Sequence, residues 1–350
     1  MQYVPVLSST GERLMPCHAA RARELVRTGR AVRRFDRGLF YIQLLDRETG
    51  EKQSIAVGID PGSKKEAYTV KSEAHTFLNI QADAVTWVKE HVETRRMMRR
   101  GRRYRKTPYR RMRMNRNQGR FRISPSTCAR WQWKLRLCTW LARYYPIDCF
   151  VVEDIQARSL KGKRRWNRSF SPLEVGKQWF YTELRKIAQV KTLQGYKTKA
   201  ERDKLGLKKS KQKMSDSFDA HCVDSWTLAN WWVGGHTAPD SKAMLYIVPL
   251  RFHRRQLHRL QPEKGGVRKP YGGTLSMDFK RGSWVKHPKH GVCYVGGITD
   301  GRISLHSLQD GSRITKVKPN TVQFLNRSSW RIRKEIAHSA TSTRLVVPCA

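Results

Sequence analysis

Residues 93–122 carry fourteen arginines or lysines against a single acid, Glu93. Like charges at this density repel one another, so the segment cannot form a core and needs a polyanion to lie against. Its first arginines recur at helical spacing, and Pro108 should end or kink any such helix. We predict a helix that binds nucleic-acid phosphates through Arg95, Arg96, Arg99, Arg100, Arg102, Arg103, Arg105, Arg110, Arg111 and Arg113.

The whole chain shares this charge bias. Its 350 residues include 71 Lys or Arg and 28 Asp or Glu, a formal net charge of +43. Nucleic acid is the expected partner of so basic a protein. An anionic membrane is the weaker interpretation, because no basic helix has a clean apolar face and no apolar run is long enough to span a bilayer. The hydrophobic fraction of 39% is enough to bury a core and excludes wholesale disorder.

The seven cysteines include no Cys-x-x-Cys pair. This pattern predicts neither a disulfide framework nor a structural zinc site, and it favours a reducing compartment. The opening residues lack a basic stretch followed by an apolar one, so we expect no secretory signal. The expected location is the cytoplasm of a prokaryote.

Periodicity predicts an α/β chain followed by a β-rich end. Strands are expected over 2–7, 31–35 and 39–45 around a helix over 18–28, and again over 54–60, 67–70, 76–82 and 148–153. Helices are expected from about residue 83, over 128–144 and over 216–232. Short β-prone runs between glycine turns in 245–340 predict a small barrel.

Carboxylates stand at conspicuous places in a protein with so few acids. Asp60 and Glu153 each end a buried strand, while Asp219 and Asp216 lie one turn apart at the start of the last predicted helix. Converging buried carboxylates need a cation, and hard oxygen ligands suit Mg²⁺. Two such ions can activate water and stabilise the leaving oxygen of a phosphodiester.

Each of these acids also has a simpler interpretation. An Asp after a strand is usually a turn former, and Asp216 can favour the helix N-terminus electrostatically. We expect Asp154 and Asp224 to be solvated surface residues, and His221 to be packed beside the acidic motif without a direct role. The order of the motifs along the chain, more than any single residue, favours a catalytic set.

Three short motifs resemble the split motifs of a RuvC-like nuclease with an RNase H-like fold. They are Gly58-Ile59-Asp60-Pro61-Gly62-Ser63, Val151-Val152-Glu153-Asp154 and Asp216-Ser217-Phe218-Asp219-Ala220. The arginine-rich segment between the first two resembles the bridge helix of IscB-type, RNA-guided transposon nucleases. The opening Val4-Pro5-Val6-Leu7 and Arg13-Leu14-Met15-Pro16 resemble the PLMP domain of that family, with Arg13 in place of a proline.

The resemblance implies a division of the chain. It consists of a PLMP-like module (1–52), a first RuvC-like part (53–92), a bridge helix (93–123), further RuvC-like parts (124–235) and a β-rich domain that reads a target-adjacent motif (236–350). Only about sixty residues separate Glu153 from Asp216, and they contain no histidine. The chain therefore resembles IsrB, the relative of IscB that lacks the HNH domain.

IsrB-like proteins are expected to be monomeric ribonucleoproteins that bind a long omega RNA and open duplex DNA at a guide-matched target. The RuvC-like site is then expected to nick the non-target strand with Mg²⁺, for which Mn²⁺ is expected to substitute. The resemblance implies that Asp60, Glu153 and Asp219 bind two metal ions. Asp216 stands where the related nucleases often have a histidine, so we expect it to act as a fourth ligand or as a base.

Two other functions remain open from the residues alone. A guide-independent, structure-selective nuclease of the junction-resolvase type would share the acids but would need neither so large a basic segment nor a separate barrel. A non-catalytic RNA-binding scaffold would use the acids structurally. A TnpB-type effector is disfavoured because its zinc ribbon of cysteine pairs is absent, and a full IscB because the HNH domain is absent.

Overall fold

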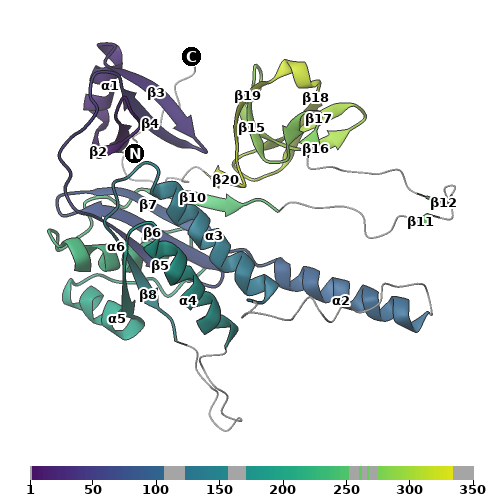
Figure 1. Cartoon of the computed structure of the whole chain (residues 1–350), viewed down its shortest axis with the longest axis horizontal. Helices are drawn as coiled ribbons and strands as arrows, with labels where there is room; N and C mark the ends of the chain where they lie inside the picture. Colours follow the sequence, from purple (N-terminus) through teal and green to yellow (C-terminus); the bar gives the residue numbers. More distant parts are fainter. Residues whose placement is uncertain are drawn as a thin grey trace, which may run out of the picture.

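The computed structural model describes residues 2–105, 123–156, 171–251, 260–261, 266–267 and 275–333. Over these residues the chain is mixed α/β, with a small N-terminal sheet, a large central sheet and a C-terminal sheet of five strands (Figure 1). Within the described residues, none of the helices is both long and apolar enough to cross a membrane.

The N-terminal sheet has the order β2-β1-β4-β3 and is covered by one short helix. Its elements are β1 (Tyr3–Leu7), β2 (Arg13–His18), α1 (Ala19–Arg27), β3 (Ala31–Asp36) and β4 (Leu39–Leu44). The side chain of His18 caps α1 at Ala20, and Gly29 follows the helix at a φ of +70°. Apolar residues that alternate along the strands pack under the helix with Leu25 and form a core of their own.

The central sheet has the order β20-β10-β7-β6-β5-β8-β9. Its strands are β5 (Ile55–Asp60), β6 (Lys65–Ser72), β7 (Thr76–Asp83), β8 (Cys149–Asp154), β9 (Gln189–Gln194), β10 (Met244–Pro249) and β20 (Trp330–Arg333). The first three strands form an antiparallel meander, and β8 and then β9 add in parallel to β5. This order agrees with the RNase H-like core that the sequence resemblance implies.

Helices cover both faces of this sheet. The helices α3 (Pro125–Leu141) and α4 (Pro172–Arg185) pack on one face, where Ile55, Val57 and Ile59 of β5 point. The helix α6 (Phe218–Val233) lies across β5, β6 and β8 on the other face, with α5 (Gly195–Lys204) beside it. Because side chains alternate along a strand, Ala56, Gly58 and Asp60 face α6.

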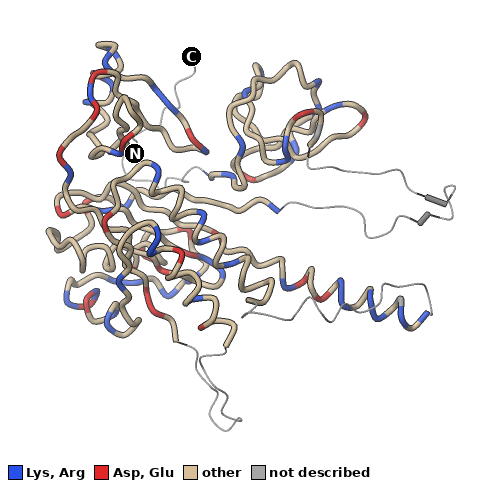
Figure 2. The backbone as a smooth tube through the Cα atoms, viewed as in Figure 1, with Lys and Arg blue, Asp and Glu red and all other residues tan. Residues whose placement is uncertain are grey.

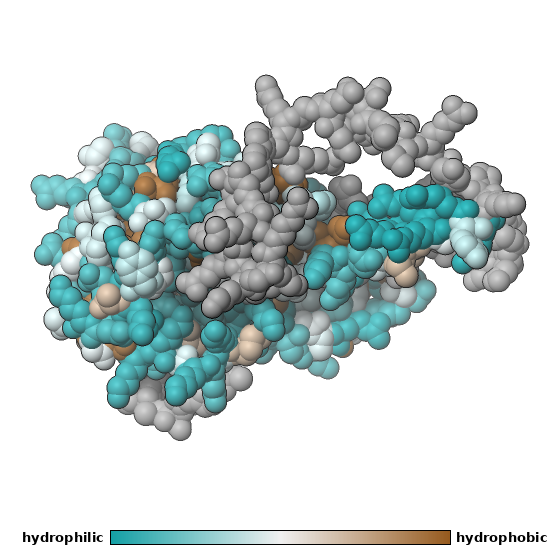
Figure 3. Space-filling model, turned by 90° about the horizontal axis from the view of Figure 1, so that it is seen from below, coloured by the Kyte–Doolittle hydropathy of each residue, from teal (hydrophilic) through white to brown (hydrophobic). Residues whose placement is uncertain are grey.

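The helix α2 (Val88–Tyr104) extends from the central body as an arm (Figure 1). Lysines and arginines follow one another along it (Figure 2). Seen from below, hydrophilic residues cover most of the visible part of the arm (Figure 3). The base of α2 packs on the body through Val88, whereas its described side chains from Glu93 onward are exposed, apart from the intermediate Gly101.

The C-terminal sheet has the order β18-β17-β16-β15-β19, with its own small core around Val285, Val295 and Leu305. Its elements are β15 (Ser283–His287), β16 (Gly291–Thr299), β17 (Arg302–Ser307), β18 (Arg313–Val317), the 3-10 turn η4 (Pro319–Thr321) and β19 (Gln323–Arg327). Two-residue strands precede it, namely β11 (Leu260–Gln261), β12 (Gly266–Val267), β13 (Leu275–Ser276) and β14 (Phe279–Lys280).

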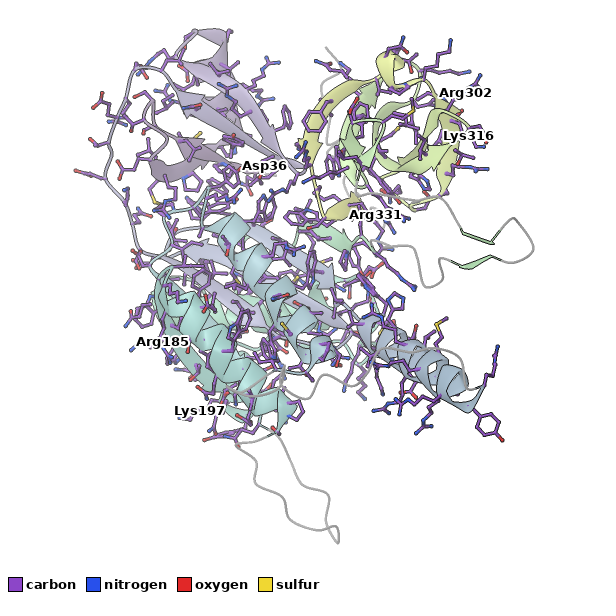
Figure 4. All side chains as sticks on the ribbon, turned by 45° about the vertical axis from the view of Figure 1, so that its right-hand side comes forward. Asp36, Arg185, Lys197, Arg302, Lys316 and Arg331 are labelled. Atoms are coloured by element: carbon purple, nitrogen blue, oxygen red, sulfur yellow. The ribbon has the colours of Figure 1, made fainter. Side chains whose placement is uncertain are left out.

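The hairpin tip between β3 and β4 connects the three sheets. Figure 4 shows Asp36 at this tip, between the N-terminal sheet and the C-terminal sheet. Trp140 and Tyr144, at the end of α3, donate hydrogen bonds to Asp36 Oδ2 over 3.1 and 2.8 Å. Arg37 donates to the carbonyl of Arg327 and lies over the Trp330 ring. The carboxylate of Asp36 thus holds the hairpin against the central body.

Most strands predicted from the sequence are present. The predicted helix from residue 83 begins at Val88, because β7 continues to Asp83. The strands β2, β9, β10 and β20, the two-residue strands β11 to β14 and the helices α4 and α5 were not predicted. Two of these, β9 and α5, border the candidate site.

Candidate active site

Two carboxylates lie side by side where neighbouring parallel strands end. The register pairs Ile59 of β5 with Val152 of β8, so Asp60 and Glu153 follow as the next pair. Both residues point to the face covered by α6. The apolar runs SIAVGID and DCFVVE form the neighbouring strands β5 and β8, and each delivers one acid to the same edge of the sheet.

Gly58 fixes how closely α6 approaches this edge. A Cβ atom at position 58 would lie 1.9 Å from the carbonyl oxygen of Ser225 and 2.7 Å from the backbone nitrogen of Ala229. Only glycine therefore permits the backbone of α6 to rest on β5. The contact orients α6 so that residues near Ser225, which follow one another at one-turn spacing, face the carboxylates of Asp60 and Glu153.

Asp60 and Glu153 are joined by a side-chain hydrogen bond. Burial, and then the negative charges of Asp60 and Asp224, raise the pKa of Glu153 to about 7. A protonated Glu153 donates this hydrogen bond to Asp60. At neutral pH the pair therefore holds either a shared proton or, once both groups are ionised, a negative charge that needs a cation.

His221 lies on α6 against the first of these acids. Its Nδ1 is 3.1 Å from Asp60 Oδ2, and its Nε2 is 2.8 Å from the carbonyl oxygen of Lys213. Burial lowers the pKa of His221, but the hydrogen bonds to Asp60 and Lys213 outweigh it and raise the pKa. Both ring nitrogens face oxygen acceptors, an arrangement that the doubly protonated imidazolium satisfies.

Asp224 follows one turn later on the same side of α6, and its side chain is only 3% exposed. Arg202 Nη1 lies 2.5 Å from Asp224 Oδ1, and Lys209 donates to the other oxygen. The charge of Asp224 acts on Glu153 across the site. The prediction that Asp224 is a solvated surface residue is wrong, because burial and two cations hold it at the site.

Asp216 lies in a different group of charges. Lys65 Nζ is 2.7 Å from Asp216 Oδ1, and Arg333 of β20 contacts the other oxygen. Burial raises the pKa of Asp216, but the hydrogen bonds and charges of Lys65 and Arg333 outweigh it and lower the pKa. This carboxylate links the segment before α6 to β6 and β20.

Asp219 occupies the first turn of α6 with its side chain 48% exposed. Its recorded ionic partner is Lys242, 3.5 Å away. Among the described residues there is no group of three or more His, Cys, Asp or Glu side chains arranged to hold a metal ion. The structure therefore brings Asp60 and Glu153 together but brings neither Asp216 nor Asp219 to them.

The donor atoms at the edge of the sheet suit a hard divalent cation. Asp60 and Glu153 supply carboxylate oxygens from two rigid strands, and a cation between them would relieve the repulsion that raises the pKa of Glu153. Asp224 would be the next oxygen donor, but both its oxygens are held by cationic side chains. Such a cation, when bound, would polarise a phosphodiester and activate a water molecule.

The predicted nucleic-acid-binding arginines fall on the arm and beyond it. Arg95, Arg96, Arg99, Arg100, Arg103 and Arg105 are exposed on or just after α2. Among the described residues, the one ion pair recorded on the arm joins Arg96 to Glu93 over 3.5 Å. The side chain of Arg102 and all of Arg110, Arg111 and Arg113 lie outside the described residues.

A family model and a solved structure each match part of the chain. A family model described as RRXRR protein matches residues 4–165. The chain carries Arg-Arg-Gly-Arg-Arg at 99–103, the pattern in that description. No curated protein matches the sequence. A solved structure of T. thermophilus RuvC in complex with a Holliday junction substrate is 10% identical, covering 52% of this chain and 98% of that one, at a TM-score of 0.29.

The strand order and the two carboxylates at adjacent strand ends agree with the RNase H-like core that the sequence resemblance implies.

Proposed function

We propose that this chain is an RNA-guided DNA endonuclease that nicks the non-target strand of duplex DNA. A long omega RNA supplies the guide, and a RuvC-like site that depends on Mg²⁺ makes the cut. Mn²⁺ can replace Mg²⁺ at this site. The observation that carries the proposal is the Asp60–Glu153 pair on β5 and β8, enclosed by α6.

The chain's own residues have definite roles in this reaction. Asp60 and Glu153 bind the metal from the sheet, and His221 holds Asp60 in orientation through Nδ1. Asp224 completes the set of oxygen ligands from the helix. The burial of these groups beneath α6 excludes bulk water, which strengthens their interaction with the scissile phosphate.

The arm α2 supports a ribonucleoprotein rather than a free enzyme. Its exposed arginines have almost no acidic partners among the described residues, so they are available for phosphates. A guanidinium contacts a backbone without reading its bases, and base pairing with a guide would supply the sequence specificity. We assign the recognition of a target-adjacent motif to residues 236–350. Residues 1–52 are assigned to a PLMP-like module.

The test begins with expression of the protein together with its native flanking locus. We expect one discrete long RNA, constant in one part and variable in the guide, to survive a high-salt wash. The purified complex should then nick a plasmid that bears the guide-matched target, and a strand-resolved gel should place the nick in the non-target strand.

Two controls define the outcomes of this test. A plasmid without the matched target should remain intact, and EDTA should stop the reaction. Cutting of branched DNA by the RNA-free protein would instead favour a junction-resolvase function. Tight RNA binding without any cutting in Mg²⁺ would favour a scaffold.

The third carboxylate can be identified by comparing Asp224→Asn with Asp219→Asn. We expect Asp224→Asn to lower the nicking rate by about a hundredfold or more, because a ligand beside Glu153 is lost. Asp219→Asn should keep the rate within about threefold, since its carboxylate is half exposed and faces Lys242. Rates are measured with preformed complex at saturating Mg²⁺, and the opposite ranking would place Asp219 at the metal.

A further inference from the structure

Lys209 reaches the carboxylate site from the loop between α5 and α6. Its ammonium group contacts Asp224 Oδ2, and its side chain remains 29% exposed to solvent. Burial lowers the pKa of Lys209, but attraction by Asp224, Asp60 and Glu153 outweighs it and raises the pKa. Lys209 is thus ion-paired with Asp224, while the charges of Asp60 and Glu153 act on it from farther away.

The helix α5, which precedes the Lys209 loop, also approaches the carboxylates. A Cβ atom at Gly195, the first residue of α5, would lie 3.1 Å from Glu153 Oε1. Arg202, further along α5, holds the other oxygen of Asp224. The side chain of Arg202 is 12% exposed, so it is the fixed partner, whereas Lys209 is the partner that solvent and ligands can reach.

We propose that Lys209 is a gate on this site: in the free protein its ammonium group holds the Asp224 oxygen that a divalent cation would need beside the carboxylates of Asp60 and Glu153. A cation cannot share these carboxylates with the ammonium group, because the two positive charges repel each other over a few ångströms. Metal binding therefore requires Lys209 to release Asp224.

The side chain of Lys209 is partly exposed, so the released ammonium group can reach solvent and a DNA strand bound there. A backbone phosphate is the natural new partner for it, since a lysine binds phosphate as a point charge. The strand and the metal ion would then bind together, and the free protein would hold its cutting site without metal. This inference rests on the proposed nuclease site but not on its RNA guide.

Titration of Mn²⁺ into the full-length, RNA-free protein, followed by calorimetry, measures the gate without any cutting. We expect Lys209→Met to bind Mn²⁺ at least about tenfold more tightly than the parent, because a competing charge is gone. Lys209→Arg, which keeps the charge, should remain near the parent value. Lys211→Met removes the same charge from an exposed position of the same loop and should leave the affinity unchanged.

Activity gives a second readout. The half-saturating Mg²⁺ concentration for cutting should fall in Lys209→Met, and the maximal rate should fall as well, because the strand loses a phosphate contact. A lysine that only supported Asp224 structurally would give the reverse metal result, weaker Mn²⁺ binding.

Unchanged or weaker Mn²⁺ binding by Lys209→Met overturns the gate, and so does the absence of Mn²⁺ binding in every variant. Loss of the calorimetric signal in Asp60→Asn with Lys209→Met shows that the signal comes from this site. A protein that behaves as expected in calorimetry but cuts no DNA contradicts the proposed function and leaves the gate intact.

Discussion

Replacing Asp60 by asparagine is expected to lower DNA cutting by at least about a thousandfold, the size of loss seen when a group that stabilises developing charge is removed. Asp60 contacts Glu153 on the neighbouring strand and His221 on the covering helix, so it links the strand and helix parts of the site. The rate is measured with a guide-matched plasmid under single-turnover conditions. RNA binding, measured by filter retention at several salt concentrations, should be unchanged.

The control is Glu183→Gln, which removes an acid from the surface of α4, where it pairs with Lys186. It should cut at the parent rate. Parent-level cutting by Asp60→Asn would contradict the assignment of the metal site to the end of β5. A joint loss of RNA binding and cutting would show a folding defect instead of a catalytic one.

Replacing Lys134 by methionine is expected to lower the free energy of unfolding by about 3–5 kcal/mol, because a buried carboxylate is left without its partner. Lys134 Nζ lies 2.8 Å from Glu66 Oε1, and the two side chains are 3% and 0% exposed. Tyr68 donates to the other oxygen of Glu66 over 2.6 Å. Urea unfolding followed by tryptophan fluorescence measures the loss.

The pH dependence of this loss follows from Glu66. Burial raises its pKa in the folded state, although the charge and hydrogen bond of Lys134 oppose the rise. Without Lys134 that pKa rises further, so the folded variant holds a proton that the unfolded chain releases above about pH 4.3. The stability difference should be largest at neutral pH and should shrink as the pH falls toward that value.

The double variant Lys134→Met with Glu66→Gln is the matched control. It removes the unpaired charge and should recover part of the stability. A single variant as stable as the parent would mean that water reaches Glu66 in the folded protein.

Asp60 and Glu153 could be predicted because the signal is local. Each ends an apolar run that can only be a buried strand, and parallel neighbours bring such ends to one edge. The strands β6 and β7 alternate in polarity and were equally readable. The segments of β9 and α5 are rich in lysine and polar residues, and their structure depends on packing against β8 and α6, which no local pattern reports.

His221 and Asp224 were visible in the sequence but were given minor roles. Almost the whole of α6 is buried, so periodicity does not reveal which of its sides meets the sheet. The signal that could have found them is Gly58, since a glycine inside a buried strand marks the close approach of another backbone. The small residues Ser225 and Ala229 supply that approach, and His221 and Asp224 lie on the adjoining turns.

Gly58 also has a consequence for how this protein tolerates change. It carries no functional group, touches no ligand and lies beneath a helix, yet any larger residue there must push α6 away from β5. The displacement would separate His221 and Asp224 from Asp60 and Glu153. In a saturation library scored for cutting, position 58 would therefore rank with the acids themselves, and a sequence lineage that keeps the activity would have no substitute for it.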